Sequence, residues 1–125
     1  MTLVLDAGAL LAVESRDRAV VAKIRSAHEE QIPVRTSSGA VAQVWRNGSQ
    51  QARLARALHG IDEQSIDPRS SREIGFLLAE TGTSDIVDAH IAVLCPDDAH
   101  LLTSDPDDLD HLLGALGRTV TIKQV

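Results

Sequence analysis

The sequence holds a single cysteine, two aromatic side chains and no long apolar run. The lone Cys95 excludes an internal disulfide bond, fits a reducing, cytoplasmic compartment and is expected to be a small buried side chain. The apolar stretches are too short to span a membrane, and the opening residues MTLVLDAG lack the basic region of a signal peptide. We therefore expect no membrane association. Stacking on nucleic-acid bases would depend on Trp45, for which core or interface packing is the favoured alternative.

Basic residues are absent from a long part of the chain. Residues 73–117 contain ten acidic side chains and no Lys or Arg, whereas the other residues carry all twelve basic side chains and eight acidic ones. Residues 31–61 have arginines but no carboxylate, and we expect Arg46, Arg53 and Arg56 to bind phosphates or an acidic partner surface. One part of the fold could thus hold cations while another meets an anion. The alternative is two ordinary solvated helix faces of opposite charge.

The length and pattern of the chain predict a single α/β domain over residues 1–125. Short apolar runs alternate with segments of helical periodicity, which favours a parallel sheet covered by helices on both faces. Strands are expected at residues 3–5, 32–36, 65–67, 99–105 and 120–123. After a turn at Gly8, helices are expected at 17–30, from Ser37 or Ser38 through Arg46, at 50–58, between Pro68 and Gly82, at 84–94, and from Pro106 onward.

The segment TSDIVDAHIAVL, residues 83–94, is the helix around which the other predictions are arranged. Ser84 is expected as its N-cap, and Asp85 and Asp88 lie three residues apart on one face. The rest of the helix is apolar nearly all round, which indicates a position inside the domain. A carboxylate at Asp88, within that apolar run, is costly unless a cation meets it. His90 points to another face, and we expect it to be a hydrogen-bonded structural histidine.

Two more aspartates follow predicted strands. Asp6 ends the first strand and Asp105 ends the strand after the central helix, so both are expected at the carboxyl edge of the sheet, where open α/β sheets bind ligands. With Asp85 and Asp88 they would form an all-oxygen group, which indicates Mg²⁺ or Mn²⁺ rather than zinc. Phosphodiester hydrolysis by a metal-activated water is the natural reaction at such a site.

Each of these aspartates also has a purely structural explanation. Asp105 precedes a proline and could be only a helix N-cap. Asp85 could only complement the helix dipole, and Asp6 could be a turn residue. Asp88 is the hardest to explain in this way, because its neighbours are apolar. The four aspartates together, at matching places in an α/β chain, favour the metal site.

These segments resemble the PIN-domain family, specifically its VapC-type toxin ribonucleases. LVLDAGALLA is similar to the family's first strand and first metal-binding aspartate, which falls on Asp6. TSDIVDAHIA resembles the central acidic helix, with Asp88 on the principal aspartate and Asp85 on a common accessory one. SSGAVAQVWR resembles the segment that usually carries a glutamate, a position held here by Gln43. An amide keeps one oxygen ligand but brings no charge, so weaker metal binding or an inactive protein would follow.

The last acidic motif is similar to LLTSDPDDL, which places Asp105 in the metal site with the hydroxyls of Thr103 and Ser104 in support. The resemblance runs from Leu3 to about Val125 and implies a three-layer α/β/α sandwich with a parallel sheet of five strands. It also implies Mg²⁺- or Mn²⁺-dependent cleavage of RNA, a homodimer, and a VapB-type antitoxin that blocks the site.

Two other functions compete with this one. The first is a catalytically silent PIN-like binding module whose acidic pocket only holds a protein partner. The second is a phosphoryl-transfer domain of receiver or phosphatase type, which also uses an acidic sheet edge. That chemistry needs a lysine near the later strand ends, and residues 73–117 contain none.

Overall fold

Three apolar residues form the central strand of the computed structural model, which describes residues 1–125. This strand, β1 (Leu3–Leu5), lies between β2 (Val34–Ser37) and β4 (His100–Thr103), while β3 (Asp62–Gln64) and β5 (Thr121–Gln124) form the edges. All four pairings are parallel, as the sequence pattern predicts. The side chains of β1 are buried on both faces of the sheet, which explains the continuous apolar run.

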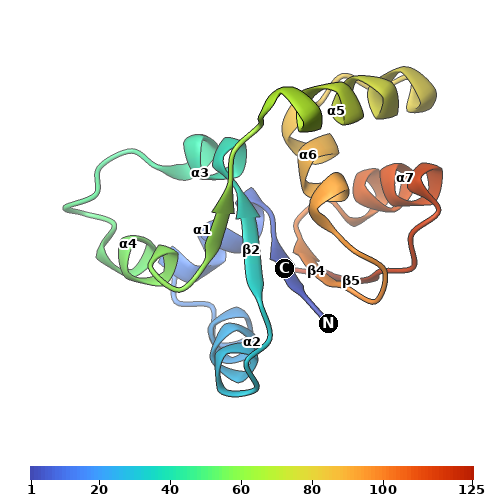
Figure 1. The fold of residues 1–125 in the computed structure, drawn as a ribbon. Helices are drawn as coiled ribbons and strands as arrows, with labels where there is room; N and C mark the ends of the chain where they lie inside the picture. Colours follow the sequence, from blue (N-terminus) through green and yellow to red (C-terminus); the bar gives the residue numbers. More distant parts are fainter.

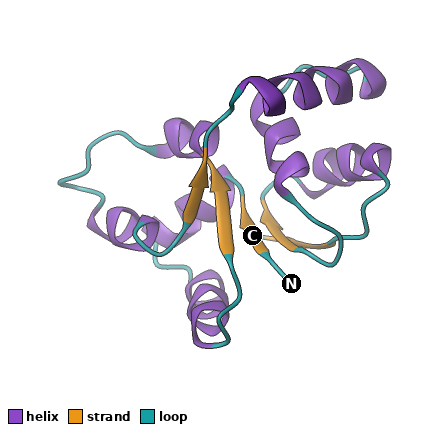
Figure 2. Cartoon of the chain, viewed as in Figure 1, coloured by secondary structure: helices purple, strands orange, loops and turns teal.

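Seven helices cover this sheet, as Figures 1 and 2 show. On one side lie α1 (Ala7–Glu14), α2 (Arg18–Glu29) and α4 (Ala52–Leu58), with α3 (Ser38–Val44) next to α1 and above it in Figure 1. On the other side α5 (Pro68–Thr81), α6 (Ile86–Leu94) and α7 (Pro106–Leu116) pack against one another. The predicted three-layer α/β/α sandwich is therefore confirmed. None of the helices combines the length and apolar character needed to cross a bilayer.

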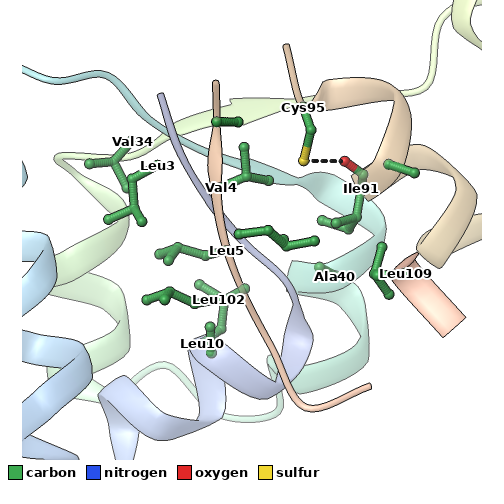
Figure 3. Packing of buried hydrophobic residues seen from close by; sticks show 14 of the residues in the cluster. Leu3, Val4, Leu5, Leu10, Val34, Ala40, Ile91, Cys95, Leu102 and Leu109 are labelled. Atoms are coloured by element: carbon green, nitrogen blue, oxygen red, sulfur yellow. Dashed lines mark hydrogen bonds between the residues drawn. The ribbon is translucent and has the colours of Figure 1, made fainter. Parts of the chain in front are cut away.

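The hydrophobic core continues through the sheet from one helical layer to the other. In Figure 3, Leu10 of α1 packs near Leu5 and Leu102, whereas Ile91 and Cys95 lie on the α6 side. Cys95 is fully buried, as expected, and its thiol donates a hydrogen bond to the Ile91 carbonyl at 3.4 Å. Burial raises the pKa of this thiol to about 12, so it acts as a packing residue and not as a nucleophile.

Two arginines hold the carboxyl end of α6. The Arg118 guanidinium donates to the carbonyls of Val93 and Cys95, each at 2.7 Å, and Arg35 donates to the Leu94 carbonyl at 3.0 Å. These carbonyls have no partner within the helix, and positive charge is favourable at the negative end of the helix dipole. The end of α6 opposite Asp88 is thereby fixed to β2 and to the segment before β5.

Two local predictions are wrong. Gly8 lies inside α1 and not in a turn, because the Asp6 side chain accepts a hydrogen bond from Ala9 and starts the helix at once. The third strand, which forms one edge of the sheet, covers residues 62–64 instead of 65–67. Its side chains are mostly exposed, so it pairs through the backbone and has no apolar pattern to reveal it. The predicted strand segment instead ends at Asp67, which forms a capping box with Ser70 at the start of α5.

Candidate metal centre

The order of the strands brings two aspartates together. The strands lie in the order β3-β2-β1-β4-β5. The chain therefore adds β2 and β3 on one side of β1, and β4 and β5 on the other side. Asp6 follows β1 directly and Asp105 lies two residues beyond β4, with Leu5 and Leu102 in register between them. Such a reversal of strand order is where open α/β sheets bind ligands. The structure places both side chains at that point.

Asp6 is buried and held by the backbone on both of its oxygens. Its Oδ1 accepts from the Ala9 N–H at 2.9 Å, and its Oδ2 accepts from the Ser104 N–H at 3.3 Å. Burial raises the pKa of Asp6, and hydrogen bonding from Thr103, Ala9 and Ser104 lowers it by less. Asp6 is thus a helix cap as well as a candidate ligand, and its orientation is set by the protein.

Asp88 is half-buried in the first turn of α6. Burial first, and then the carboxylates of Asp85, Asp105, Asp6 and Asp108, together raise its pKa to about 6. This shift places all four negative groups within electrostatic reach of Asp88. Burial among like charges is the environment that a bound cation would relieve.

The N-cap of α6 is Asp85 and not Ser84, which corrects the prediction for this helix. The Asp85 side chain is exposed and accepts from the Asp88 N–H at 2.9 Å, so capping accounts for its position.

Capping does not account for the position of the Asp105 side chain. Asp105 precedes α7, but its exposed carboxylate makes no capping hydrogen bond, while its own N–H donates to the Thr103 hydroxyl at 2.9 Å.

No basic side chain pairs with this group of aspartates. The ion pairs of the structure join Met1 to Asp98, Arg35 to Asp62 and Arg69 to Glu73. No three His, Cys, Asp or Glu side chains converge closely enough to form a complete metal-ligand group. The donors present fit an ion such as Mg²⁺, which binds through one or two carboxylates and keeps several waters.

Gln43 is exposed on α3, and its side chain makes no hydrogen bond within the chain. It lies one helical turn after Gly39, where an added Cβ would come within 3.0 Å of the Val87 side chain of α6. The segment that carries Gln43 therefore packs beside the start of α6. Contact between Gln43 and a metal stays a prediction.

His90 is a structural residue, as expected. It is almost fully buried on α6, and its Nδ1 lies 2.6 Å from the Ser37 hydroxyl at the start of α3. Burial lowers the pKa of His90, so its neutral form joins α6 to the end of β2. Trp45 is 39% exposed and covers Gly48 just beyond the end of α3, so it is not a core residue.

Only two of the three singled-out arginines lie on a common surface. Arg53 and Arg56 line an open groove of about 950 Å³ between α1, α2 and α4. Arg46 instead folds back onto the carbonyls of Ala42 and Trp45. The groove has three further arginines, Arg16, Arg18 and Arg25, which were not predicted because nothing in the sequence indicates that α2 and α4 line the same groove.

Comparison with known proteins gives the fold and little more. No family model matches the sequence, and no curated protein matches it. Among solved structures, the chain is similar to one chain of the crystal structure of VapBC2 from Rickettsia felis bound to a DNA fragment from their promoter. The TM-score is 0.72, with 100% of this chain and 99% of that chain covered at 12% sequence identity. At this identity the likeness establishes a shared fold.

The raised pKa of Asp88 predicts how the stability of the metal-free protein depends on pH. Between its ordinary value of 3.8 and its folded value of about 6, the folded state holds a proton that the unfolded chain has released. The contribution of Asp88 to the free energy of unfolding therefore falls as the pH rises through that window, and it stays low at higher pH. Asp88→Asn should stabilise the metal-free protein above pH 6 by about 1 kcal/mol after allowance for solvent screening, and by nearly nothing below pH 4.

Urea unfolding at a series of pH values in chelator measures this difference. Asp110→Asn, which removes another carboxylate from an exposed position on α7, is the matched control and should follow the wild-type pH profile. A destabilised Asp88→Asn protein at pH 7 would contradict the picture of a repelled carboxylate and would indicate a structural role.

Proposed function

We propose that the protein is a metal-dependent endoribonuclease that acts as the homodimeric toxin of a toxin–antitoxin pair. The observation that carries this proposal is that Asp6 and Asp105 follow neighbouring strands at the strand-order reversal, while Asp88 on α6 lies within electrostatic reach of both and no basic side chain pairs with the three. The fold shared with a chain of the VapBC2 structure and the resemblance of the four motifs to VapC-type PIN domains support it independently.

Asp6, Asp88 and Asp105 would hold Mg²⁺ or Mn²⁺. When bound, such an ion supplies Lewis acidity and a water of lowered pKa for attack on a phosphodiester. Asp6 brings a carboxylate oriented by two backbone N–H groups, whereas the Asp105 carboxylate has no protein partner and is free to turn towards a ligand. Asp85 fixes the first turn of α6, and so the position of Asp88, and adds negative potential.

The silent binding module is the second candidate, and two observations favour it. Gln43 replaces the charged ligand of the family motif, and the carboxylates present do not form a complete ligand group. Under this alternative the acidic edge would bind a basic side chain of a partner protein. The two functions differ in whether purified protein turns over RNA.

The ribonuclease proposal predicts cleavage of single-stranded RNA in Mn²⁺ and no cleavage in chelator. Asp88→Asn and Asp105→Asn should each lower the cleavage rate by at least about 100-fold, because each removes a charge from the metal site. Gel assays on a panel of RNA substrates measure this, with Asp110→Asn as the charge-matched control.

Equal cleavage by wild type and both variants would identify a contaminating nuclease and contradict the proposal. Mn²⁺ binding without any cleavage would favour the silent module instead. Light scattering of the same samples tests the homodimer, which should have twice the 13.4 kDa mass of the chain.

The groove between α1, α2 and α4 is our candidate for the surface that binds the antitoxin. Its floor is apolar, with Val13, Val21 and Ile24, and its lining includes five arginines and one acidic residue, Glu29. None of these arginines forms an ion pair within the chain. An apolar floor with a cationic border fits an amphipathic, acidic protein segment better than it fits an RNA backbone.

The groove lies away from the metal centre. It is lined by Val13 and by Arg16 near the far end of α1, whose eight residues run about 12 Å from Asp6. A partner seated there would need a further segment to reach the acidic edge of the sheet. Anchoring and inhibition would therefore depend on separate parts of the partner.

Arg53→Ala/Arg56→Ala should weaken antitoxin binding at least about 10-fold and reduce its salt dependence, while RNA cleavage by the free protein is kept. Arg69→Ala/Arg72→Ala on α5 is the matched control, since it removes two arginines at the same spacing outside the groove. Titration calorimetry with the cognate antitoxin measures the affinities. Equal loss in both double variants, or loss of RNA affinity alone, would contradict the assignment of the groove.

A further inference from the structure

Gly8 and Ser104 approach each other more closely than any other residue type at position 8 would allow. An added Cβ at Gly8 would lie 2.6 Å from the Ser104 Cβ and 3.2 Å from its backbone nitrogen, and closer still to its hydroxyl. Non-bonded carbon atoms pack at about 3.5–4.0 Å. Because one clashing atom is the Ser104 Cβ and not a flexible side-chain end, the backbone at Ser104 would have to move.

Backbone conformation does not explain this glycine. Gly8 lies within α1, and the glycines with positive φ are Gly82 and Gly117 at helix ends. Alanine is the better helix former at an interior position. The space between α1 and the segment after β4 is therefore what requires glycine here.

This close approach lies beside the residues that position two carboxylates of the candidate site, those of Asp6 and Asp105. Ser104 donates its N–H to Asp6 Oδ2 at 3.3 Å and is followed directly by Asp105. The Asp105 N–H in turn bonds to Thr103, the last residue of β4. Movement of Ser104 away from α1 would thus lengthen its bond to Asp6 and shift Asp105 at the same time.

We infer that Gly8 is a positioning residue that sets the separation of the Asp6 and Asp105 carboxylates by admitting Ser104 against the first turn of α1. The inference rests on the metal-dependent function proposed above. An added methyl group would displace Ser104 by about 1 Å, and misplacement of that size in a site can cost up to about 100-fold in rate.

A double-mutant cycle tests this role. Gly8→Ala should weaken Mn²⁺ binding at least about 10-fold by titration calorimetry, and RNA cleavage at limiting Mn²⁺ should fall with it. In the Ser104→Gly background, which lacks both clashing side-chain atoms but keeps the N–H to Asp6, the same change should alter affinity by no more than about twofold. Gly75→Ala is the control, because an added Cβ there meets no atom within 4 Å; it should leave Mn²⁺ affinity unchanged.

Wild-type affinity in Gly8→Ala, or an equal loss in both backgrounds, would overturn the inference. Thermal melts without metal separate this result from a failure of the proposed function. Gly8→Ala should lower the melting temperature in the wild-type background and raise it, or leave it unchanged, in the Ser104→Gly background. If the wild type binds no Mn²⁺, the proposed metal centre is wrong and the positioning role falls with it, while the melts still report whether the close contact is real. If Gly8→Ala fails to fold in both the wild-type and the Ser104→Gly background, the positioning role of Gly8 is also contradicted.

Discussion

Repulsion among carboxylates at one edge of the sheet is the constraint on which the rest of the structure depends. Burial and four acidic neighbours raise the pKa of Asp88, and no arginine or lysine pairs with it. The fold must therefore hold these groups together against their mutual repulsion. It does so through the hydrogen-bonded pairing of β1 with β4 and through the arginines at the far end of α6. These contacts are remote from the carboxylates, so they fix the site without neutralising it.

The candidate site combines carboxylates that are held by hydrogen bonds with one that is not. Asp6 accepts from two backbone N–H groups, and Asp85 is committed to the first turn of α6, whereas the carboxylate of Asp105 has no partner. A hydrated ion such as Mg²⁺ needs few protein ligands but near-ideal geometry. One carboxylate held by the backbone and a second without a protein partner can meet that need, provided that the distance between their backbones is held. We assign that task to the close packing of Gly8 against Ser104.

The sequence predicted the parallel sheet and the position of Asp6 and Asp105 after neighbouring strands, because buried strands and helix starts leave local patterns. β1 is uniformly apolar, and the Asp85–Asp88 segment begins an apolar helix. Features set by contacts between distant segments were not predictable. β3 has no apolar pattern and is a strand only because β2 lies beside it, and the arginines of α2 and α4 form one groove only after folding. The caps were partly predictable: Ser84 and Asp85 are both good N-caps, and only the helix geometry chooses Asp85.

The central claim is that the carboxylates of Asp6, Asp88 and Asp105 bind one divalent metal ion. Calorimetric titration of Mn²⁺ into chelator-treated wild type, Asp88→Asn and Asp110→Asn tests it most directly, at a pH well above the Asp88 pKa of about 6. We expect one ion per wild-type chain, unchanged binding by Asp110→Asn, and affinity at least about 10-fold weaker for Asp88→Asn, since a unit charge close to a divalent ion is lost. Absence of binding by the wild type, or equal affinities for all three proteins, would contradict the account.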